Sequence, residues 1–467
     1  MLTPVLRFTA FAALTALAGA AACADNDEPI TPDAGVTPDA PTPPTPTTFA
    51  VRIENVAPWT VLKSGFASTK VVPSGGPLGP GEAYDITFTA GRNQAFSFAA
   101  MFGESNDWFF GPGPTGIPLY DAMGNPISGD VTAQVGLWNA GTEIDQEPAV
   151  GDATGPRQSA PDAGAPDPDP TVRAIPIAAP LSAGGTFTRP ATEQMIRVTV
   201  TPGANRQFTV RVQNVSTATT LVTSAGSRDV HISPVVWALH AAAEPMFKPG
   251  TADRGQGLEL VAESGRGQNL ATVLGVLSGA ATPASPLVWA VHRGTTPLYG
   301  LGEADRALGL ERVAENGDTG PLSTSMMTPR TGLVASGVLN TPVGAAMPGA
   351  ARPGAAFEGE ITALPGDRLS FVTMFGMSND WFFAPDPDGI ELFNADGSPM
   401  AGDVTHMIGI YDAGTELDEE LAIGASTGPQ QPMPDFGAPD PIRQVRAVGS
   451  RYPAPASTHL RVTLTPR

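Results

Sequence analysis

Short segments in which apolar and polar residues alternate recur along this chain. Phe49-Ala-Val-Arg-Ile-Glu54 has a period of two, and Phe208-Thr-Val-Arg-Val-Gln213 repeats it. This alternation is typical of a β-strand with one buried face and one exposed face. A second pair of matching segments, Ile196–Thr201 and Leu460–Thr465, lies further along the chain. The chain therefore contains two units that begin and end with similar strands.

The internal repeat predicts domains at 49–203 and 207–467. Within them, residues 80–175 align without a gap to residues 353–448, at an offset of 273. The 53 glycines and 49 prolines favour many short strands joined by turns over helical bundles. We therefore predict an all-β protein.

The second unit contains an extra segment that is itself doubled at an offset of 52 residues. Each copy predicts a buried strand followed by a short helix with Leu, Val and Ala on one face. The doubled strands are Ser233–His240 and Ser285–His292, and the doubled helical segments are Gly257–Glu263 and Gly309–Glu315. The apolar face consists of Leu258, Val261 and Ala262 in the first helical segment, and of Leu310, Val313 and Ala314 in the second. One explanation is a tandem duplication that enlarges the second domain. The other is that one copy crosses back and completes the first domain, which requires contacts between 233–264 or 285–316 and residues 49–203.

The N-terminus has the features of an exported protein. Residues 1–23 combine one basic residue with an apolar run, as in a secretory signal. Leu17–Cys23 resembles a bacterial lipobox, in which Cys23 becomes lipidated, although Ala20 stands where Leu is usual. Two outcomes are therefore expected as alternatives: an outer-membrane or cell-surface lipoprotein, or a protein that is cleaved in the ordinary way and secreted. Residues 24–48 are rich in Pro, Thr and Asp, which predicts a disordered, extended stalk of about 70 Å.

The charge of the chain restricts its partners. The formal net charge is −20, and no long apolar run follows the signal. Nucleic acids and bare anionic membranes are therefore poor partners, since binding them needs clustered Lys and Arg. An acidic surface attracts divalent cations, although solubility alone is the commoner reason for acidity. Cys23 is the only cysteine, so no intramolecular disulfide is possible.

Two motifs that combine apolar and acidic residues occur once in each unit. Met101–Phe110 and Trp138–Glu143 recur as Met374–Phe383 and Tyr411–Glu416, again offset by 273. Such motifs suggest a core strand that runs out into a loop carrying oxygen ligands.

Four motifs of the second unit, in their order along the chain, resemble the spondin N-terminal domain, the module of F-spondin and mindin that also occurs in bacterial secreted proteins. These motifs are Ser233–His240, Gly257–Glu263, Met374–Trp381 and Asp412–Glu416. The likeness covers 207–467, and 49–203 only from about Pro80 onward. It implies tandem antiparallel β-sandwiches, the second with strand–helix insertions, calcium bound in loops at one edge, and a role in adhesion or matrix binding. The disulfides of the animal proteins are absent.

The resemblance implies a ligand set for Ca²⁺ in each unit. These sets are Asp380, Asp412 and Glu416 in the second, and Asp107, Asn139 and Glu143 in the first. Calcium takes six to eight oxygen ligands, and its affinity rises with the number of charged ligands. We therefore expect the second site to bind more tightly. The alternative is that these acids only cap turns, which we expect for Asp130 and Asp403.

The sequence gives weaker evidence for an enzyme than for a calcium site. Gly424–Gly428 fits the G-x-S-x-G pattern, but the following Pro-Gln-Gln-Pro denies it the required helix, and Ala153 replaces Ser426 in the first unit. His406 is the only histidine near the carboxylates, and Ala133 replaces it in the first unit. We expect His240 and His292 to be core or strand-end residues.

We therefore expect a non-catalytic, calcium-binding adhesion module with an extracellular glycan or protein partner, reaching a membrane only through Cys23. The alternatives are a purely structural calcium-stabilised module, and a carbohydrate-active or metal-dependent hydrolase that uses Asp380 and Glu416.

Overall fold

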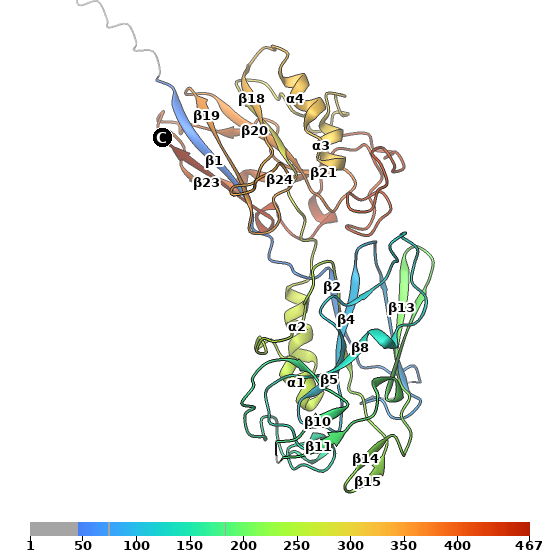
Figure 1. Cartoon of the computed structure of the whole chain (residues 1–467). Helices are drawn as coiled ribbons and strands as arrows, with labels where there is room; N and C mark the ends of the chain where they lie inside the picture. Colours follow the sequence, from blue (N-terminus) through green and yellow to red (C-terminus); the bar gives the residue numbers. More distant parts are fainter. Residues whose placement is uncertain (1–44, 73–74, 183) are drawn as a thin grey trace, which may run out of the picture. The chain divides into compact units, whose positions relative to one another are not determined.

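The computed structural model describes residues 45–72, 75–182 and 184–467 (Figure 1). The expected signal peptide and Cys23 lie outside these residues, as does the expected stalk up to residue 44. Two residues assigned to the stalk, Thr47 and Thr48, belong instead to the first strand, β1 (Thr47–Asn55). The all-β prediction is confirmed, because antiparallel sheets dominate the described chain.

The first sandwich has a four-stranded sheet with the order β3-β13-β12-β7 and a larger sheet with the order β2-β16-β4-β5-β8-β9, with β6 paired to β4. The strands of the smaller sheet are β3 (Ala83–Thr89), β7 (Gly129–Asp130), β12 (Ile196–Pro202) and β13 (Gln207–Asn214). Those of the larger sheet are β2 (Lys63–Ala67), β4 (Ala95–Met101), β5 (Trp108–Pro112), β6 (Ile117–Pro118), β8 (Val135–Asn139), β9 (Arg173–Ala174) and β16 (Val235–His240).

The second sandwich repeats this plan with the sheet orders β19-β1-β26-β23 and β18-β17-β20-β21-β24-β25, with β22 paired to β20. Beside β1, the smaller sheet contains β19 (Ala356–Ala363), β23 (Gly402–Asp403) and β26 (Leu460–Pro466). The larger sheet contains β17 (Leu287–His292), β18 (Leu333–Leu339), β20 (Arg368–Met374), β21 (Trp381–Pro385), β22 (Ile390–Glu391), β24 (Ile408–Asp412) and β25 (Arg446–Ala447). Two hairpins lie outside these sheets: β10 (Ala178–Pro180) with β11 (Thr186–Thr188), and β14 (Leu221–Thr223) with β15 (Gly226–Arg228).

The strand pairing divides the chain differently from the expected boundaries at 49–203 and 207–467. β1, expected to open the first domain, lies in the middle of a sheet of the second sandwich, antiparallel to both β19 and β26. In Figure 1 this blue strand lies among orange and red ones. β13, expected to open the second domain, pairs with β3 and β12 of the first sandwich. The residues from Thr45 to Arg467 accordingly group as one compact unit.

One copy of the doubled segment completes the first sandwich, as the second of our two explanations requires. β16 lies between β2 and β4 and is antiparallel to both. The other copy, which begins with β17, stays in the second sandwich between β18 and β20. The duplication therefore supplies one strand–helix unit to each sandwich.

Each larger sheet is covered on its outer face by a pair of short helices. These are α1 (Leu258–Ser264) and α2 (Gln268–Val276) in the first sandwich, and α3 (Leu310–Asn316) and α4 (Gly320–Met326) in the second. The predicted apolar faces of α1 and α3 are buried against the sheets. Burial of this surface is what stabilises such short helices, since helices of this length are marginal in isolation. The short 3-10 helices are Thr132–Gln134, Gly155–Arg157, Thr192–Gln194, Thr405–Met407, Gly449–Arg451 and Ala456–Thr458.

The core between the two sheets of each sandwich is rich in aromatic residues. In the first it includes Phe98, Phe102 and Trp108, and in the second Phe371 and Trp381. The alternation read from the sequence is confirmed in β13, whose residues alternate between more exposed and buried along its whole length. Both tryptophans directly follow the aspartates that we expected to bind calcium, so packing of the core fixes where those aspartates lie.

Candidate metal centre

The turn between β20 and β21 places Asp380 at the buried end of the second sandwich. Ser378 closes this turn, because its hydroxyl donates to the carbonyl of Phe375 and accepts the backbone N–H of Trp381, at 2.8 and 3.0 Å. The register of β21 against β24 then sets Trp381 opposite Asp412. The sequence motif and the strand pairing together therefore bring Asp380 and Asp412 to one place.

Asp380 is fully buried and only half satisfied. Its Oδ2 accepts three hydrogen bonds: from the backbone N–H and hydroxyl of Thr415, both at 2.7 Å, and from the N–H of Glu416 at 3.0 Å. Its Oδ1 is buried and has no hydrogen-bond partner. Burial, and then the charge of Asp412, raise the pKa of Asp380 to about 7 despite the three donors. An unpartnered carboxylate oxygen in the interior is costly unless something positive lies against it.

Asp412 is also fully buried, but it has several partners among the described residues. Its Oδ1 accepts the backbone N–H of Gly414 at 2.6 Å. Gly414 lies in the AGTE loop and has a φ of 72°. Its Oδ2 lies 2.5 Å from Arg446 and 2.7 Å from Arg451. Burial still raises the pKa of Asp412, while the hydrogen bond from Arg451 opposes this.

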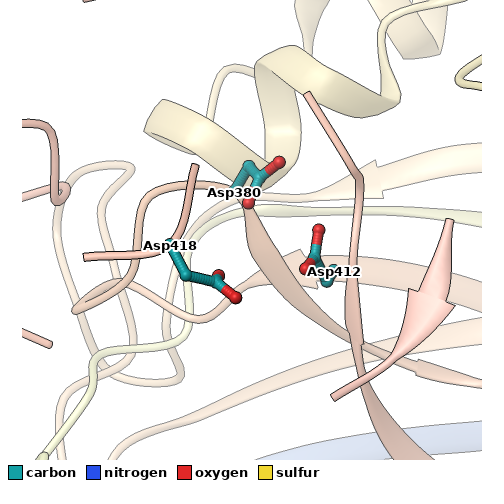
Figure 2. Close-up of side chains that lie close together, drawn as sticks. All are labelled: Asp380, Asp412 and Asp418. Atoms are coloured by element: carbon teal, nitrogen blue, oxygen red, sulfur yellow. The ribbon is translucent and has the colours of Figure 1, made fainter. Parts of the chain in front are cut away.

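Three carboxylates meet at this point, and they are not the three that we expected. Oxygen atoms of Asp380, Asp412 and Asp418 all lie within 4.8 Å of one another. Figure 2 shows the three side chains directed toward a common space. Asp418 also accepts a hydrogen bond from the indole N–H of Trp381 at 2.5 Å, and Arg451 donates to it.

The charges around this space do not balance. Asp440 pairs with Arg446 at the edge of the group. When ionised, Asp380, Asp412, Asp418 and Asp440 carry four negative charges, and Arg446 and Arg451 carry two positive ones. The formal surplus of two negative charges equals the charge of one divalent cation.

Glu416 does not belong to this carboxylate group. Its backbone N–H donates to Asp380, but its side chain turns to Gly437, whose N–H donates to Oε1 at 2.6 Å. Its Oε2 is buried and unpartnered, as is Oε2 of Glu315 on α3. Burial raises the pKa of Glu315 to about 7, and the negative charge of Glu416 adds to this effect. Glu416 and Glu315 are therefore two further acidic groups, each with a buried oxygen that has no hydrogen-bond partner.

The first sandwich repeats this arrangement, but it lacks one carboxylate and one arginine of the second. Asp107 Oδ2 accepts N–H bonds from Thr142 and Glu143 at 2.9 and 3.1 Å, and its Oδ1 is buried without a partner. Burial raises the pKa of Asp107 to about 7. Asn139 replaces Asp412, donating to Asp145 at 2.9 Å and accepting the N–H of Gly141.

The loss of this carboxylate in the first sandwich is matched by the loss of one arginine. By the offset of 273, Asp145, Asp167 and Arg173 correspond to Asp418, Asp440 and Arg446, whereas Ala178 stands where the second sandwich has Arg451. Arg173 pairs with both Asp145 and Asp167. Asp107, Asp145, Asp167 and Arg173 therefore leave the same formal surplus of two negative charges. No group of three carboxylates, histidines or cysteines comes together in the described part of this sandwich.

Other expectations from the sequence can be placed directly. Asp130 and Asp403 cap turns, as expected, by accepting the N–H of Thr132 and Thr405 at 2.8 Å. His240 and His292 are buried, and each Nε2 lies 2.8 Å from a serine hydroxyl of the neighbouring strand, as core histidines do.

Sequence reasoning missed Asp418, Asp145, Glu315 and the arginines. The signal that could have found most of them is the one that found Asp380: Asp418, Arg446 and Asp440 recur at the same offset of 273, and Glu315 recurs at 52. Arg451 could not be found in this way, because it has no counterpart.

Fold and site together define a protein of paired antiparallel β-sandwiches with buried carboxylate groups at corresponding positions. No family model and no curated protein matches the chain. The resemblance to the spondin N-terminal domain therefore stays a prediction. Among the described residues, no helix is long and apolar enough to cross a membrane.

Proposed function

We propose that the protein is a non-catalytic extracellular binding module whose sandwiches hold Ca²⁺ beside the AGTE loops. The observation that carries this proposal is the Oδ1 atom of Asp380: it is buried, has no hydrogen-bond partner, and belongs to a carboxylate group with an uncompensated charge. The Oδ1 atom of Asp107 in the first sandwich is likewise buried and has no hydrogen-bond partner.

The donor set suits a hard divalent cation. All three side chains of the second group offer carboxylate oxygens, and the group contains no histidine or cysteine. Oxygen-only sets favour Ca²⁺ or Mg²⁺, and sets containing nitrogen or sulfur favour Zn²⁺. Loops that can shift by a few tenths of an ångström favour Ca²⁺, which tolerates irregular coordination, over Mg²⁺, which requires a near-octahedral site.

A bound cation would tie together three segments of chain: the turn before β21, the end of β24 and the loop that carries Asp418. Its charge would replace the proton that burial otherwise places on Asp380. In the expected role, this rigid edge presents the neighbouring loops to an extracellular glycan or protein, since ordering loops in advance reduces the entropy lost on binding.

We expect the second sandwich to bind Ca²⁺ more tightly than the first. It offers three carboxylates within 4.8 Å, whereas in the first an amide takes the place of one of them and is already engaged by Gly141 and Asp145. Affinity for Ca²⁺ rises with the number of charged ligands.

Terbium luminescence tests the proposal, because Tb³⁺ replaces Ca²⁺ in oxygen sites and is excited by a nearby indole. Trp381 donates to Asp418, so it lies within reach of a bound ion. We expect saturable emission from the full-length chain that Ca²⁺ displaces, and we expect both Asp380→Asn and Trp381→Phe to remove its tighter-binding component, while the weaker component excited by Trp108 of the first sandwich remains. Asp403→Asn is the matched control, since that carboxylate only caps a turn.

Emission that Asp380→Asn leaves unchanged would place any bound ion elsewhere and refute the proposed site. Calcium-dependent binding of the protein to cells or glycans is then measured separately: calcium binding without calcium-dependent adhesion would favour the purely structural module.

A further inference from the structure

A cavity of about 620 Å³ opens in the first sandwich, between the β14–β15 hairpin, β16 and the end of α1. Neither Asp107 nor Asn139 lines it. Its wall combines apolar side chains with charged ones: Pro77, Met101, Pro234, Glu104, Arg228 and His231. Charged side chains that face a concave, partly apolar surface are the usual composition of a ligand site.

The second sandwich contains the corresponding cavity, of about 370 Å³, without these charges. The backbone is the same at this place: the N–H of Gly103 donates to the carbonyl of His231, and the N–H of Gly376 to that of Pro283. At the offsets of 273 and 52, the positions of Glu104, Arg228 and His231 are occupied by Met377, Ala280 and Pro283. The fold therefore forms with apolar residues at all three positions, so it does not require the charges.

Glu104 fixes the position and the charge of His231. Its side chain is 1% exposed, and its oxygens accept both the backbone N–H and the Nδ1 of His231, at 3.0 and 2.9 Å. This hydrogen bond raises the pKa of His231. Burying a carboxylate costs free energy, and the second sandwich avoids this cost because it has methionine at the corresponding position. Glu104 is thus a positioning residue that also favours the protonated form of the imidazole at the cavity wall.

Arg228 is the second cation of this wall. It forms no ion pair with any described residue, and its Nε is the only buried arginine or lysine nitrogen among them that has no hydrogen-bond partner. Its Nε therefore lacks the hydrogen bond that a buried guanidinium nitrogen normally makes. Planar guanidinium groups bind carboxylates through paired hydrogen bonds.

We propose that this cavity binds a small organic carboxylate. Arg228 and His231 hold the anionic group, and Pro77, Met101 and Pro234 contact the hydrocarbon body. The acidic neighbours Asp229, 3.9 Å from His231, and Glu263 disfavour ligands with more than one negative charge. This inference is independent of the calcium proposal.

The test is a ligand-observed NMR titration of the full-length chain with benzoate, hexanoate and glucuronate, using benzamide as the neutral counterpart of benzoate. We expect saturable binding of at least one carboxylate and none of benzamide. Arg228→Ala, which introduces the residue of the second sandwich, should weaken binding about tenfold or more, the value of one charge-assisted hydrogen bond. Arg352→Ala in the wall of the second cavity is the matched control and should change nothing.

A pH series separates a positioning role of Glu104 from a purely structural one. Binding should weaken as pH rises and His231 loses its proton, since Glu104, Asp229, Arg228 and Glu82 are the charged groups that act on this ring. In Glu104→Met, which carries the residue type found at Met377, the weakening should begin at lower pH. Equal binding of benzoate and benzamide, unchanged binding by Arg228→Ala, or no binding of any of the three carboxylates would each overturn the inference. Unchanged melting temperatures of the variants establish that they fold.

Discussion

Replacing Asp380 by asparagine should stabilise the protein without calcium and destabilise it with calcium. The three donors on Oδ2 would find the amide oxygen of the introduced asparagine in place, whereas the position of Oδ1 would receive an N–H₂ group. That group can donate to Asp412 across the site, where the wild-type chain has two carboxylates facing each other. The substitution therefore removes both the buried charge and the repulsion.

The magnitude follows from the pKa. Burial and Asp412 raise the pKa of Asp380 from 3.8 to about 7, and each unit corresponds to about 1.4 kcal/mol. Ionised Asp380 thus costs about 4 kcal/mol of stability well above pH 7. The pKa of Asp380 is higher in the folded state than in the unfolded state, so the folded protein binds more protons between about pH 4 and pH 7. The contribution of Asp380 to wild-type stability in EDTA therefore falls as pH rises from about 4 to 7, and then levels off. Asparagine abolishes this loss, and Ca²⁺ compensates it in the wild type.

The assay is thermal unfolding of wild type and Asp380→Asn at pH 5 and pH 8, in EDTA and in saturating Ca²⁺. At pH 8 in EDTA we expect the variant to melt several degrees above wild type, and in Ca²⁺ we expect the order to reverse. At pH 5 in EDTA the difference should shrink, since wild-type Asp380 is then protonated. Asp403→Asn should follow the wild type in its response to Ca²⁺.

A lower melting temperature of Asp380→Asn in EDTA at pH 8 would refute this reasoning. It would mean that the carboxylate is ionised and adequately stabilised by its protein neighbours, so no cation is needed to explain it.

Two further predictions concern the elements around the site. Arg451→Ala removes a guanidinium from Asp412 and Asp418. In EDTA, urea unfolding should show a loss of about 1–3 kcal/mol in the free energy of unfolding, less than for a fully buried pair because this arginine is one-third exposed. Added Ca²⁺ should restore more stability to the variant than to the wild type, and equal stability of the two proteins in EDTA would contradict the role of this pair. Deletion of residues 45–55 removes β1 from between β19 and β26. Limited proteolysis should then cut the second sandwich (287–467) while the first (63–276) stays resistant, and resistance of both parts would show that β1 is dispensable.

The local pattern of the chain was sufficient to predict strands, helices and the position of the acidic loops. Alternation identified β1, β13, β12 and β26, because one face of each is buried, and the spacing of Leu, Val and Ala identified the faces of α1 and α3. Repetition at 273 residues located Asp107 and Asp380 beside tryptophans that fill the cores. Alternation and helical spacing are properties of short segments, and the repeat is a comparison of two such segments, so none of these signals depends on how the chain folds.

The tertiary structure alone decided which segments meet. Phe49–Glu54 and Phe208–Gln213 have nearly the same pattern, so nothing in either sequence specifies the sheet that it joins; packing against β19 and β26, or against β3 and β12, makes that choice. The same holds at the site: Glu416 lies in the same loop as Asp412, yet its carboxylate turns toward Gly437, and Asp418 takes the place expected for it. A spacing along the chain determines which side chains a loop carries, but the direction of each depends on hydrogen-bond donors and arginines that come from distant strands.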